Sequence, residues 1–126
     1  MPLGKVLVID DDPDIRAYLT TLIEGWGFKA LTAGNGVDGI ARAVVEKPSL
    51  ILLDLNMRGL TGFDTARRIR ALPEIAATPI LALTALRKAE DHDEAHYAGC
   101  DVVLTKPIGD KKLYEAVTRN FGEIYA

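Results

Sequence analysis

The sequence has only one cysteine, Cys100, so no disulfide can form within the chain, and a lone thiol fits a reducing compartment. No apolar run is as long as the roughly 20 residues of a membrane-spanning helix, and residues 1–5 show no signal-peptide core. The net charge of −3 gives no general affinity for nucleic acid. We therefore expect a cytoplasmic domain that binds neither membranes nor nucleic acid.

Repeats, low-complexity segments and linkers are also missing. The 126 residues fit one domain, which we expect to span residues 1–126 without a separate output domain. Apolar residues make up 48% of the chain, which excludes wholesale disorder.

Two kinds of apolar segment alternate along the chain. Short runs of consecutive Val, Ile and Leu are typical of strands buried on both faces. These are Val6–Ile9, Leu50–Leu53, Ile80–Leu83, Val102–Leu104 and, more weakly, Phe28–Thr32.

Between these runs, apolar residues recur with helical spacing. They are Ile15, Leu19, Leu22, Ile23 and Trp26; Val37, Ile40, Ala41 and Val44; Phe63, Ala66 and Ile69; and Leu113, Val117, Phe121 and Ile124. A further, mostly polar helix is expected over Lys88–Ala98. Asp12 and Pro13 are a cap and a first helical residue, while Pro48 and Pro73 end helices. The alternation predicts an α/β fold with a parallel sheet covered on both faces.

Ligands of such sheets bind at the carboxyl ends of the strands. The predicted strands end in acid, hydroxyl and ammonium groups: Asp10, Asp11 and Asp12; Asp54; Thr84; and Lys106. Each residue alone has an ordinary interpretation as a cap, turn or strand residue, but their joint occurrence favours a site. Clustered carboxylates repel one another, and Mg²⁺ bound by oxygen ligands would offset this repulsion. A carboxylate beside a metal, an ammonium and a hydroxyl can attack phosphorus.

Four motifs, over residues 6–16, 50–57, 83–85 and 104–107, resemble the receiver domain of bacterial two-component response regulators. The resemblance extends from about Lys5 to Phe121 and implies a doubly wound, flavodoxin-like fold with strand order 2-1-3-4-5. It also implies site roles: Asp54 as phosphoacceptor, Asp11 as a direct Mg²⁺ ligand, Asp10 as an acid that acts on the metal largely through water, Asn56 as a backbone-carbonyl ligand, Thr84 as the switch hydroxyl and Lys106 as the lysine that pairs with the phosphoryl group. It further implies a cis peptide bond at Lys106-Pro107, which would aim Lys106 at the site.

Two positions depart from the family pattern. Arg58 stands where a proline is usual, which loosens that loop and adds a cation near the metal site. Val103 stands where Tyr or Phe is usual, and valine lacks the rotamer range of that aromatic lever. We therefore expect the switch to be read out through the loop and the helix at 88–98, or through dimer formation.

The resemblance implies a signalling phosphoacceptor that assists its own phosphorylation and dephosphorylation, not an enzyme with a separate substrate. Its donor would be a histidine kinase or a phosphotransfer protein. Its output would be a phosphorylation-dependent contact with a downstream protein, or a phosphorelay step. The docking face would comprise the helix at 88–98, the strand at 102–104 and the last helix. A homodimer remains open.

Other functions fit the residues less well. The alternative is a protein-binding module of the same fold that does not depend on phosphorylation, which Arg58 and Val103 favour slightly. A phosphatase with an aspartyl-phosphate intermediate would need an acid at Asn56. His92 and His96 have a spacing that can bind zinc, but no third ligand is evident. The remaining basic cluster, Arg67, Arg68 and Arg70, is too small to indicate nucleic-acid binding.

Overall fold

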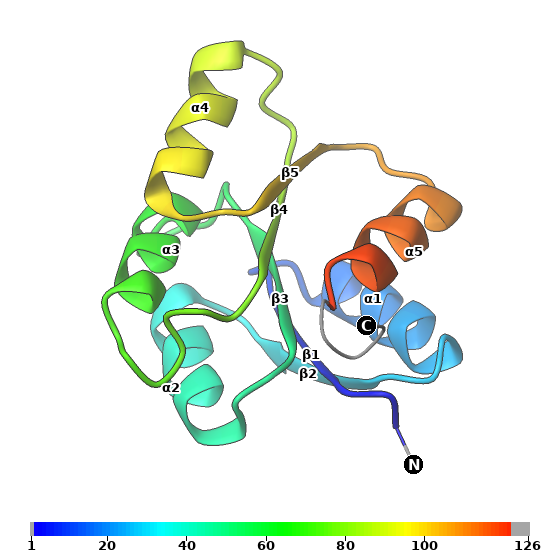
Figure 1. The fold of residues 1–126 in the computed structure, drawn as a ribbon. Coiled ribbons are helices and arrows are strands. Elements are labelled where there is room, and N and C mark those ends of the chain that lie inside the picture. The colour runs from blue at the N-terminus through cyan, green and yellow to red at the C-terminus, as the bar shows by residue number, and fades with distance from the viewer. Residues whose placement is uncertain (1, 122–126) are drawn as a thin grey trace.

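The computed structural model describes residues 2–121, which form a parallel sheet with helices on both sides (Figure 1). The strands are β1 (Lys5–Ile9), β2 (Lys29–Ala33), β3 (Leu50–Asp54), β4 (Ile80–Thr84) and β5 (Val102–Thr105). The helices are α1 (Pro13–Gly25), α2 (Gly36–Glu46), α3 (Gly62–Arg70), α4 (Ala89–Ala98) and α5 (Asp110–Arg119). The strand order is β2-β1-β3-β4-β5 and every neighbouring pair is parallel, which confirms the predicted doubly wound α/β fold.

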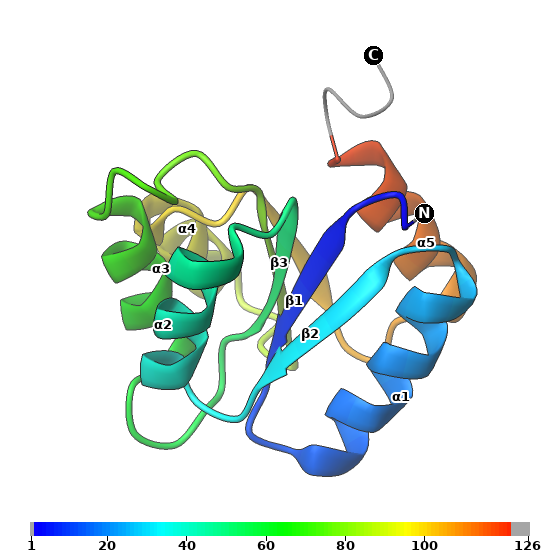
Figure 2. The same ribbon diagram turned by 90° about the horizontal axis from the view of Figure 1, so that it is seen from below.

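The sheet separates two apolar cores. Helices α1 and α5 cover one face, and α2, α3 and α4 cover the other (Figure 2). Because successive side chains of a strand point to opposite faces, Val6 and Val8 of β1 pack with Ile23 of α1 in one core. Leu7 and Ile9 belong to the other core. Every residue of β3 and β4 is buried, as their uninterrupted apolar runs predict.

The register aligns the carboxyl ends of the strands. Ile9 of β1 pairs with Leu53 of β3, and Thr84 of β4 pairs with Thr105 of β5. Asp54 is the last residue of β3, one position beyond that first pair. The residues that follow these strands therefore lie along one edge of the sheet.

Local signals at the helix ends are confirmed. The side chain of Asp12 accepts a hydrogen bond from the Asp14 amide at 2.9 Å, and Pro13 is the first residue of α1. An acceptor at this position satisfies one of the free N–H groups of the first helical turn. Helix α3 ends at Arg70, before Pro73.

The predicted inner face of α2 is partly wrong. Val37 is 60% exposed and Ala41 is also exposed, whereas Gly39 and Ala43 are buried. A Cβ atom on Gly39 would lie 2.6 Å from Cδ1 of Ile9, so α2 approaches the sheet too closely for a side chain at this point. Because α2 packs through small residues, its buried face carries little of the hydrophobic pattern that the prediction used.

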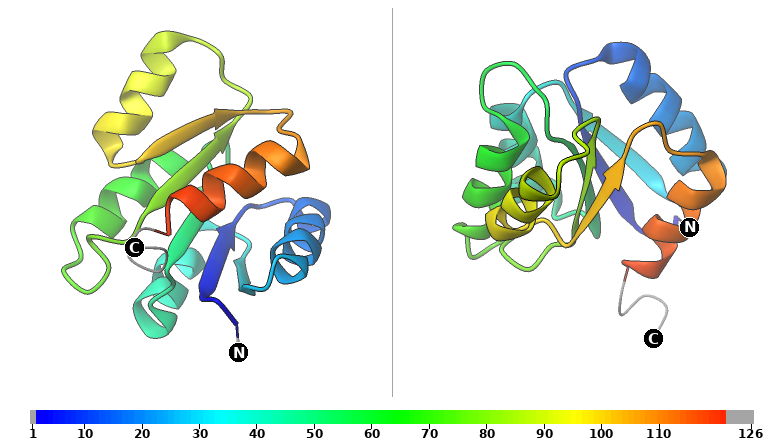
Figure 3. Two further views of the ribbon diagram at one scale, coloured as in Figure 1. Left: turned by 45° about the vertical axis from the view of Figure 1, so that its right-hand side comes forward. Right: turned by 90° about the horizontal axis from the view of Figure 1, so that it is seen from above.

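The aromatic residues close the α1–α5 side of the molecule. Phe121, which lies just beyond α5, stacks on Phe28 with ring centroids 4.4 Å apart. Trp26, the last residue of the first predicted helical stripe, is half-buried and meets Tyr114 edge to face at 5.3 Å. These contacts fix α5 on the same face of the sheet as α1 (Figure 3). Ile124, the last residue of the predicted fifth helix, lies outside the described residues.

Arg70 anchors the start of β5 and is not part of a surface basic cluster. Its guanidinium donates hydrogen bonds to the carbonyls of Gly99, Ala76 and Thr78 at 2.9, 2.9 and 2.6 Å. It also pairs with the Asp101 carboxylate at 2.9 Å. The side chain therefore joins α3 to the segments that lead into β4 and β5.

The structure also describes the single cysteine and the helices that were considered for a membrane span. Cys100 is 3% exposed, and burial raises the pKa of its thiol to about 11, so the thiol stays protonated near neutral pH. No helix within residues 2–121 has the length and apolar character needed to cross a membrane.

Candidate functional site

Polar side chains from four segments gather at the carboxyl edge of the sheet. Asp10 follows β1, Asp54 ends β3, Thr84 ends β4, and Lys106 follows β5. Asp10, Asp54 and Thr84 are only 2%, 6% and 0% exposed. Burying a polar group without a hydrogen-bond partner costs free energy, so any buried polar atom here that lacks a protein partner indicates a place for a ligand.

Three carboxylates are close enough to share one cation. One oxygen from each of Asp10, Asp11 and Asp54 lies within 4.8 Å of the other two. Two unit charges 4 Å apart repel by about 4 kcal/mol at an effective dielectric constant of about 20. Lys106 Nζ lies 3.4 Å from Asp54 Oδ1 and offsets part of this repulsion. Within the described part of the chain, the three carboxylates face only Lys106 and the exposed Arg58 side chain, 3.7 Å from Asp11, so the cluster favours a further cation.

Asp10 has an oxygen suited to such a cation. Its Oδ1 accepts a hydrogen bond from the Asp12 amide at 2.9 Å, but its buried Oδ2 has no hydrogen-bond partner among residues 2–121. Burial raises the pKa of Asp10 above its usual value, and the charges of Asp54 and Asp11 add to this effect, while the Asp12 amide and Lys106 oppose it. Mg²⁺ is a hard cation that takes carboxylate oxygens as ligands. The donor set therefore fits Mg²⁺.

Asp54 is held from two sides. Its Oδ1 accepts hydrogen bonds from the Asn56 amide at 3.1 Å and from Lys106 Nζ at 3.4 Å. The start of α3 packs directly against the Asp54 backbone. A Cβ atom on Gly62 would lie only 2.4 Å from the Asp54 carbonyl oxygen. Only glycine allows this approach. The carboxylate thus projects from a tightly packed strand end.

Thr84 and Lys106 are joined through their backbones. The Lys106 amide donates to the Thr84 carbonyl at 2.7 Å, while the Thr84 hydroxyl oxygen accepts from the Leu86 amide at 2.9 Å. The hydroxyl is therefore engaged with the loop after β4. The Lys106-Pro107 peptide bond is cis, as the resemblance implies.

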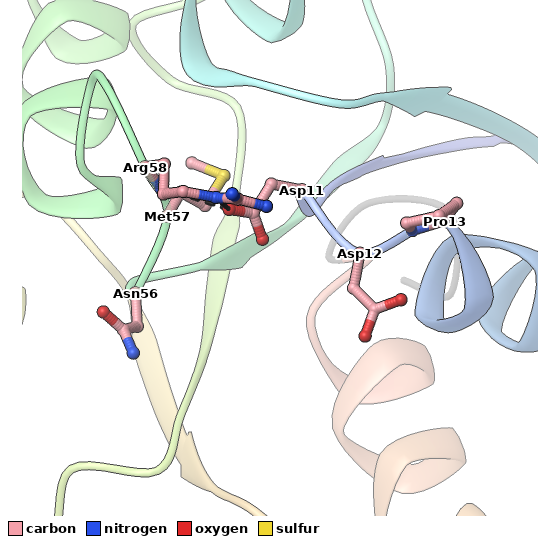
Figure 4. A pocket seen from close by; sticks show the side chains of 6 residues that line it. All are labelled: Asp11, Asp12, Pro13, Asn56, Met57 and Arg58. Atoms are coloured by element: carbon pink, nitrogen blue, oxygen red, sulfur yellow. Dashed lines mark hydrogen bonds and ion pairs between the residues drawn. The ribbon is translucent and has the colours of Figure 1, made fainter.

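An open cleft of about 530 Å³ leads to the carboxylates (Figure 4). It is lined by Asp11, Asp12, Pro13, Asn56, Met57 and Arg58. The Arg58 amide donates to Asp11 Oδ2 at 3.1 Å, and its guanidinium Nε lies 3.7 Å from the same oxygen. The Arg58 side chain is 96% exposed, so this ion pair contributes little to stability. The Asn56 side chain points away from Asp11 in Figure 4.

Two arginines bond the backbone of site residues, a role that was not predicted from the sequence. Arg16 Nη1 donates to the Asp10 carbonyl at 2.8 Å, and Arg87 Nη2 donates to the Lys106 carbonyl at 3.3 Å. The position of Arg16 in the first turn of α1, beside the end of β1, was a usable signal. Arg87 lies in a loop, where spacing carried no comparable information.

Comparison with known proteins gives this geometry a family. The sequence pattern described as "Response regulator receiver domain" matches residues 6–118. The chain belongs to the response regulator receiver domain family. This receiver domain is therefore a module of two-component signalling, with bacterial relatives.

The similarity to individual proteins extends over nearly the whole chain. The protein PilH of Pseudomonas aeruginosa is 33% identical, with 91% of this chain and 95% of PilH covered. The structure of the chemotaxis protein CheY4 of Vibrio cholerae matches at a TM-score of 0.88 and 30% identity, over 93% of this chain and 98% of that one. The receiver domain of the sensor histidine kinase PA1611 of P. aeruginosa matches at a TM-score of 0.87 and 25% identity, over 95% of this chain and 98% of that one. That structure has a magnesium ion coordinated in its active-site cleft. The chain spans about half the length, 48%, of several other curated relatives.

The two departures from the family pattern lie in different parts of this receiver domain. Arg58 stands at the mouth of the cleft, next to Asp11. Val103 is half-buried in β5 and packs against the core under α2, α3 and α4. Arg58 can therefore touch what enters the cleft, whereas Val103 lies away from the cleft and packs partly against the core.

Proposed function

We propose that this receiver domain accepts a phosphoryl group on Asp54 from the phosphohistidine of a histidine kinase or of a phosphotransfer protein. The observation that carries the proposal is the Asp54 carboxylate, which is 6% exposed yet lies 3.4 Å from Lys106 Nζ and within 4.8 Å of oxygens of both Asp10 and Asp11. A structural ion pair would need only one acid and one base. The two additional acids indicate a site for a cation and for a transferred anionic group.

Mg²⁺ would be held by the side chains of Asp10, Asp11 and Asp54 and by the backbone carbonyl of Asn56. The unpartnered Asp10 Oδ2 and the outward direction of the Asn56 side chain support this ligand set. When bound, the ion supplies positive charge that reduces repulsion between the carboxylates and the phosphoryl oxygens. The chain's own cation, Lys106, supplies a second positive charge next to Asp54.

The chemistry assigned to Asp54 is a single displacement at phosphorus. Both hydrogen bonds described above for its carboxylate are made to Oδ1, so we assign the attack to Oδ2. A bond forms between this oxygen and phosphorus while the P–N bond of the donor breaks. The electron pair of that bond stays on the imidazole nitrogen, which takes a proton. Attack of water on phosphorus later returns the aspartate and inorganic phosphate. The protein's contribution is positioning and charge neutralisation.

The signal would follow from the new charge on Asp54. Thr84 offers its hydroxyl and Lys106 its ammonium group to the phosphoryl oxygens, which favours a second conformation of the nearby loops. We place the docking of a downstream protein, or of a second copy, on the face formed by α4, β5 and α5, and the activity in the cytoplasm. Passing the phosphoryl group onward in a relay is the other output of the same chemistry.

Incubation with acetyl phosphate and Mg²⁺ tests the proposal. We expect intact-protein mass spectrometry to show a gain of one phosphoryl group, which is lost when EDTA is present. The variant Asp54→Ala should show no gain. Asp64→Asn is the matched control, because Asp64 is an exposed acid of α3, and it should be labelled like the wild type. A binding module that works without phosphorylation would stay unlabelled in every sample.

A further inference from the structure

His92 of α4 reaches back to the loop after β4. Its Nε2 lies 2.7 Å from the Leu86 carbonyl oxygen and 3.5 Å from the Thr105 hydroxyl at the end of β5. Because a carbonyl only accepts, Nε2 carries the hydrogen of the shorter bond. One imidazole thus joins a helix, a loop and a strand. His96, one turn further along α4, bonds the Cys100 carbonyl at 3.0 Å at the other end of the helix.

Leu86 is bonded at both of its backbone groups. Its carbonyl is held by His92, and its amide holds the Thr84 hydroxyl. The Leu86 amide donates to Thr84 Oγ1 at 2.9 Å, and the Leu86 carbonyl accepts from His92. The same loop is also tied to the residue after β5, since Arg87 donates to the Lys106 carbonyl at 3.3 Å. A turn of the Thr84 side chain toward Asp54 would move Oγ1 and would strain or break its bond from the Leu86 amide, unless Leu86 moves with it.

We propose that His92 is a positioning residue that holds the loop at 85–88 in the resting arrangement and thereby opposes the turn of Thr84 toward a phosphoryl group on Asp54. The proposal rests on the proposed function, because it concerns the response of the same site. Loss of the His92 bond lowers the cost of moving Leu86, so phosphoryl binding becomes more favourable. A movement of the loop is passed to α4 through the same contact.

The surroundings of Val103 favour this route. Val103 is a short side chain packed against the core, and it has no polar group with which to follow the loop. The His92 imidazole is polar, half-buried and already bonded to the loop. The coupling between loop and output face therefore passes through α4 in this chain.

Beryllofluoride, a mimic of the phosphoryl group, tests the role of His92 in the full chain with Mg²⁺. The apparent affinity is measured by titration, with the amide NMR signals of Thr84 and Leu86 as the readout. His92→Leu removes the donor and should bind the mimic about fivefold more tightly, the factor that one net hydrogen bond represents. His92→Gln, which carries an amide donor, should restore the wild-type affinity. His96→Leu removes the other histidine of α4 and should also behave like the wild type.

Urea unfolding of each variant separates this role from a purely structural one. A structural role predicts a loss of stability in His92→Leu without tighter binding of the mimic. Equal affinities of the wild type and His92→Leu, or a His92→Gln variant that behaves like His92→Leu, would overturn the proposal. If the wild type itself fails to bind beryllofluoride, the proposed function fails, and the role of His92 fails with it.

Discussion

Strands β3 and β5 end at the same edge of the sheet but in very different surroundings. All five residues of β3 are buried, whereas all four residues of β5 are half-buried. Asp54 ends the first strand, and Lys106 follows the second with a side chain that is 34% exposed. The contrast shows a carboxylate fixed in the buried centre of the sheet and a more accessible ammonium group at its edge.

Truncating one leucine in each of these two strands tests the contrast, and it should change the free energy of unfolding more than any other substitution considered below. Leu53→Ala in β3 should lower the free energy of unfolding by about 4 kcal/mol, because a fully buried leucine leaves a cavity in a packed core. Leu104→Ala in β5 should cost only about 1 to 2 kcal/mol, since that side chain is half-buried. Urea unfolding followed by circular dichroism measures both, and equal losses would remove the distinction.

The next largest effect concerns the anchored end of β5. Arg70→Ala should lower the free energy of unfolding by about 2 to 3 kcal/mol, because several hydrogen bonds from one charged group are lost together. Arg68→Ala is the control on the same helix, and its exposed side chain predicts a change within about 0.5 kcal/mol. Similar unfolding midpoints for the two variants would show that β5 is not anchored through Arg70.

The smallest effect concerns Asp10, the buried acid beside Asp54. The pKa of Asp10 is raised in the folded protein, chiefly by burial. The stability that it contributes is therefore present below the unfolded pKa and is lost as the pH rises through the folded pKa. Without metal, Asp10→Asn should be about 1 kcal/mol more stable than the wild type at neutral pH, because an ionised buried acid is removed.

Two comparisons check that prediction. The advantage of Asp10→Asn should shrink as the pH falls into the usual titration range of aspartate, and added Mg²⁺ should stabilise the wild type more than the variant. Asp14→Asn, at an exposed acid of α1, should show neither effect. An advantage that is independent of pH would contradict the assigned cause.

The fold was predictable where the sequence carries strong local signals. Uninterrupted apolar runs located β3 and β4, and Asp12 with Pro13 located the start of α1. The alignment of parallel strand ends then brought Asp10 and Asp54 to one edge. The roles assigned to these side chains stay predictions until phosphorylation is measured.

Other features depend on packing that no local pattern encodes. The inner face of α2 was misplaced because the buried residues Gly39 and Ala43 are small and carry little hydrophobic signal. Arg70 was grouped with surface charges because its backbone partners lie outside its own helix, in segments whose path the local pattern does not show. The contact of His92 with Leu86 depends on the path of a loop, which spacing alone does not give.

The buried carboxylates and the exposed surface of α4 can change independently of one another. Tyr97 of α4 is 91% exposed, and no hydrogen bond described above links it to Asp54. If the proposed function holds, replacing such a residue would alter which protein is recognised, while the surroundings of Asp54 stay the same. After gene duplication, copies of such a domain could therefore acquire different partners while the residues around the carboxylates stay the same. Pathways that use the same chemistry could then avoid cross-talk.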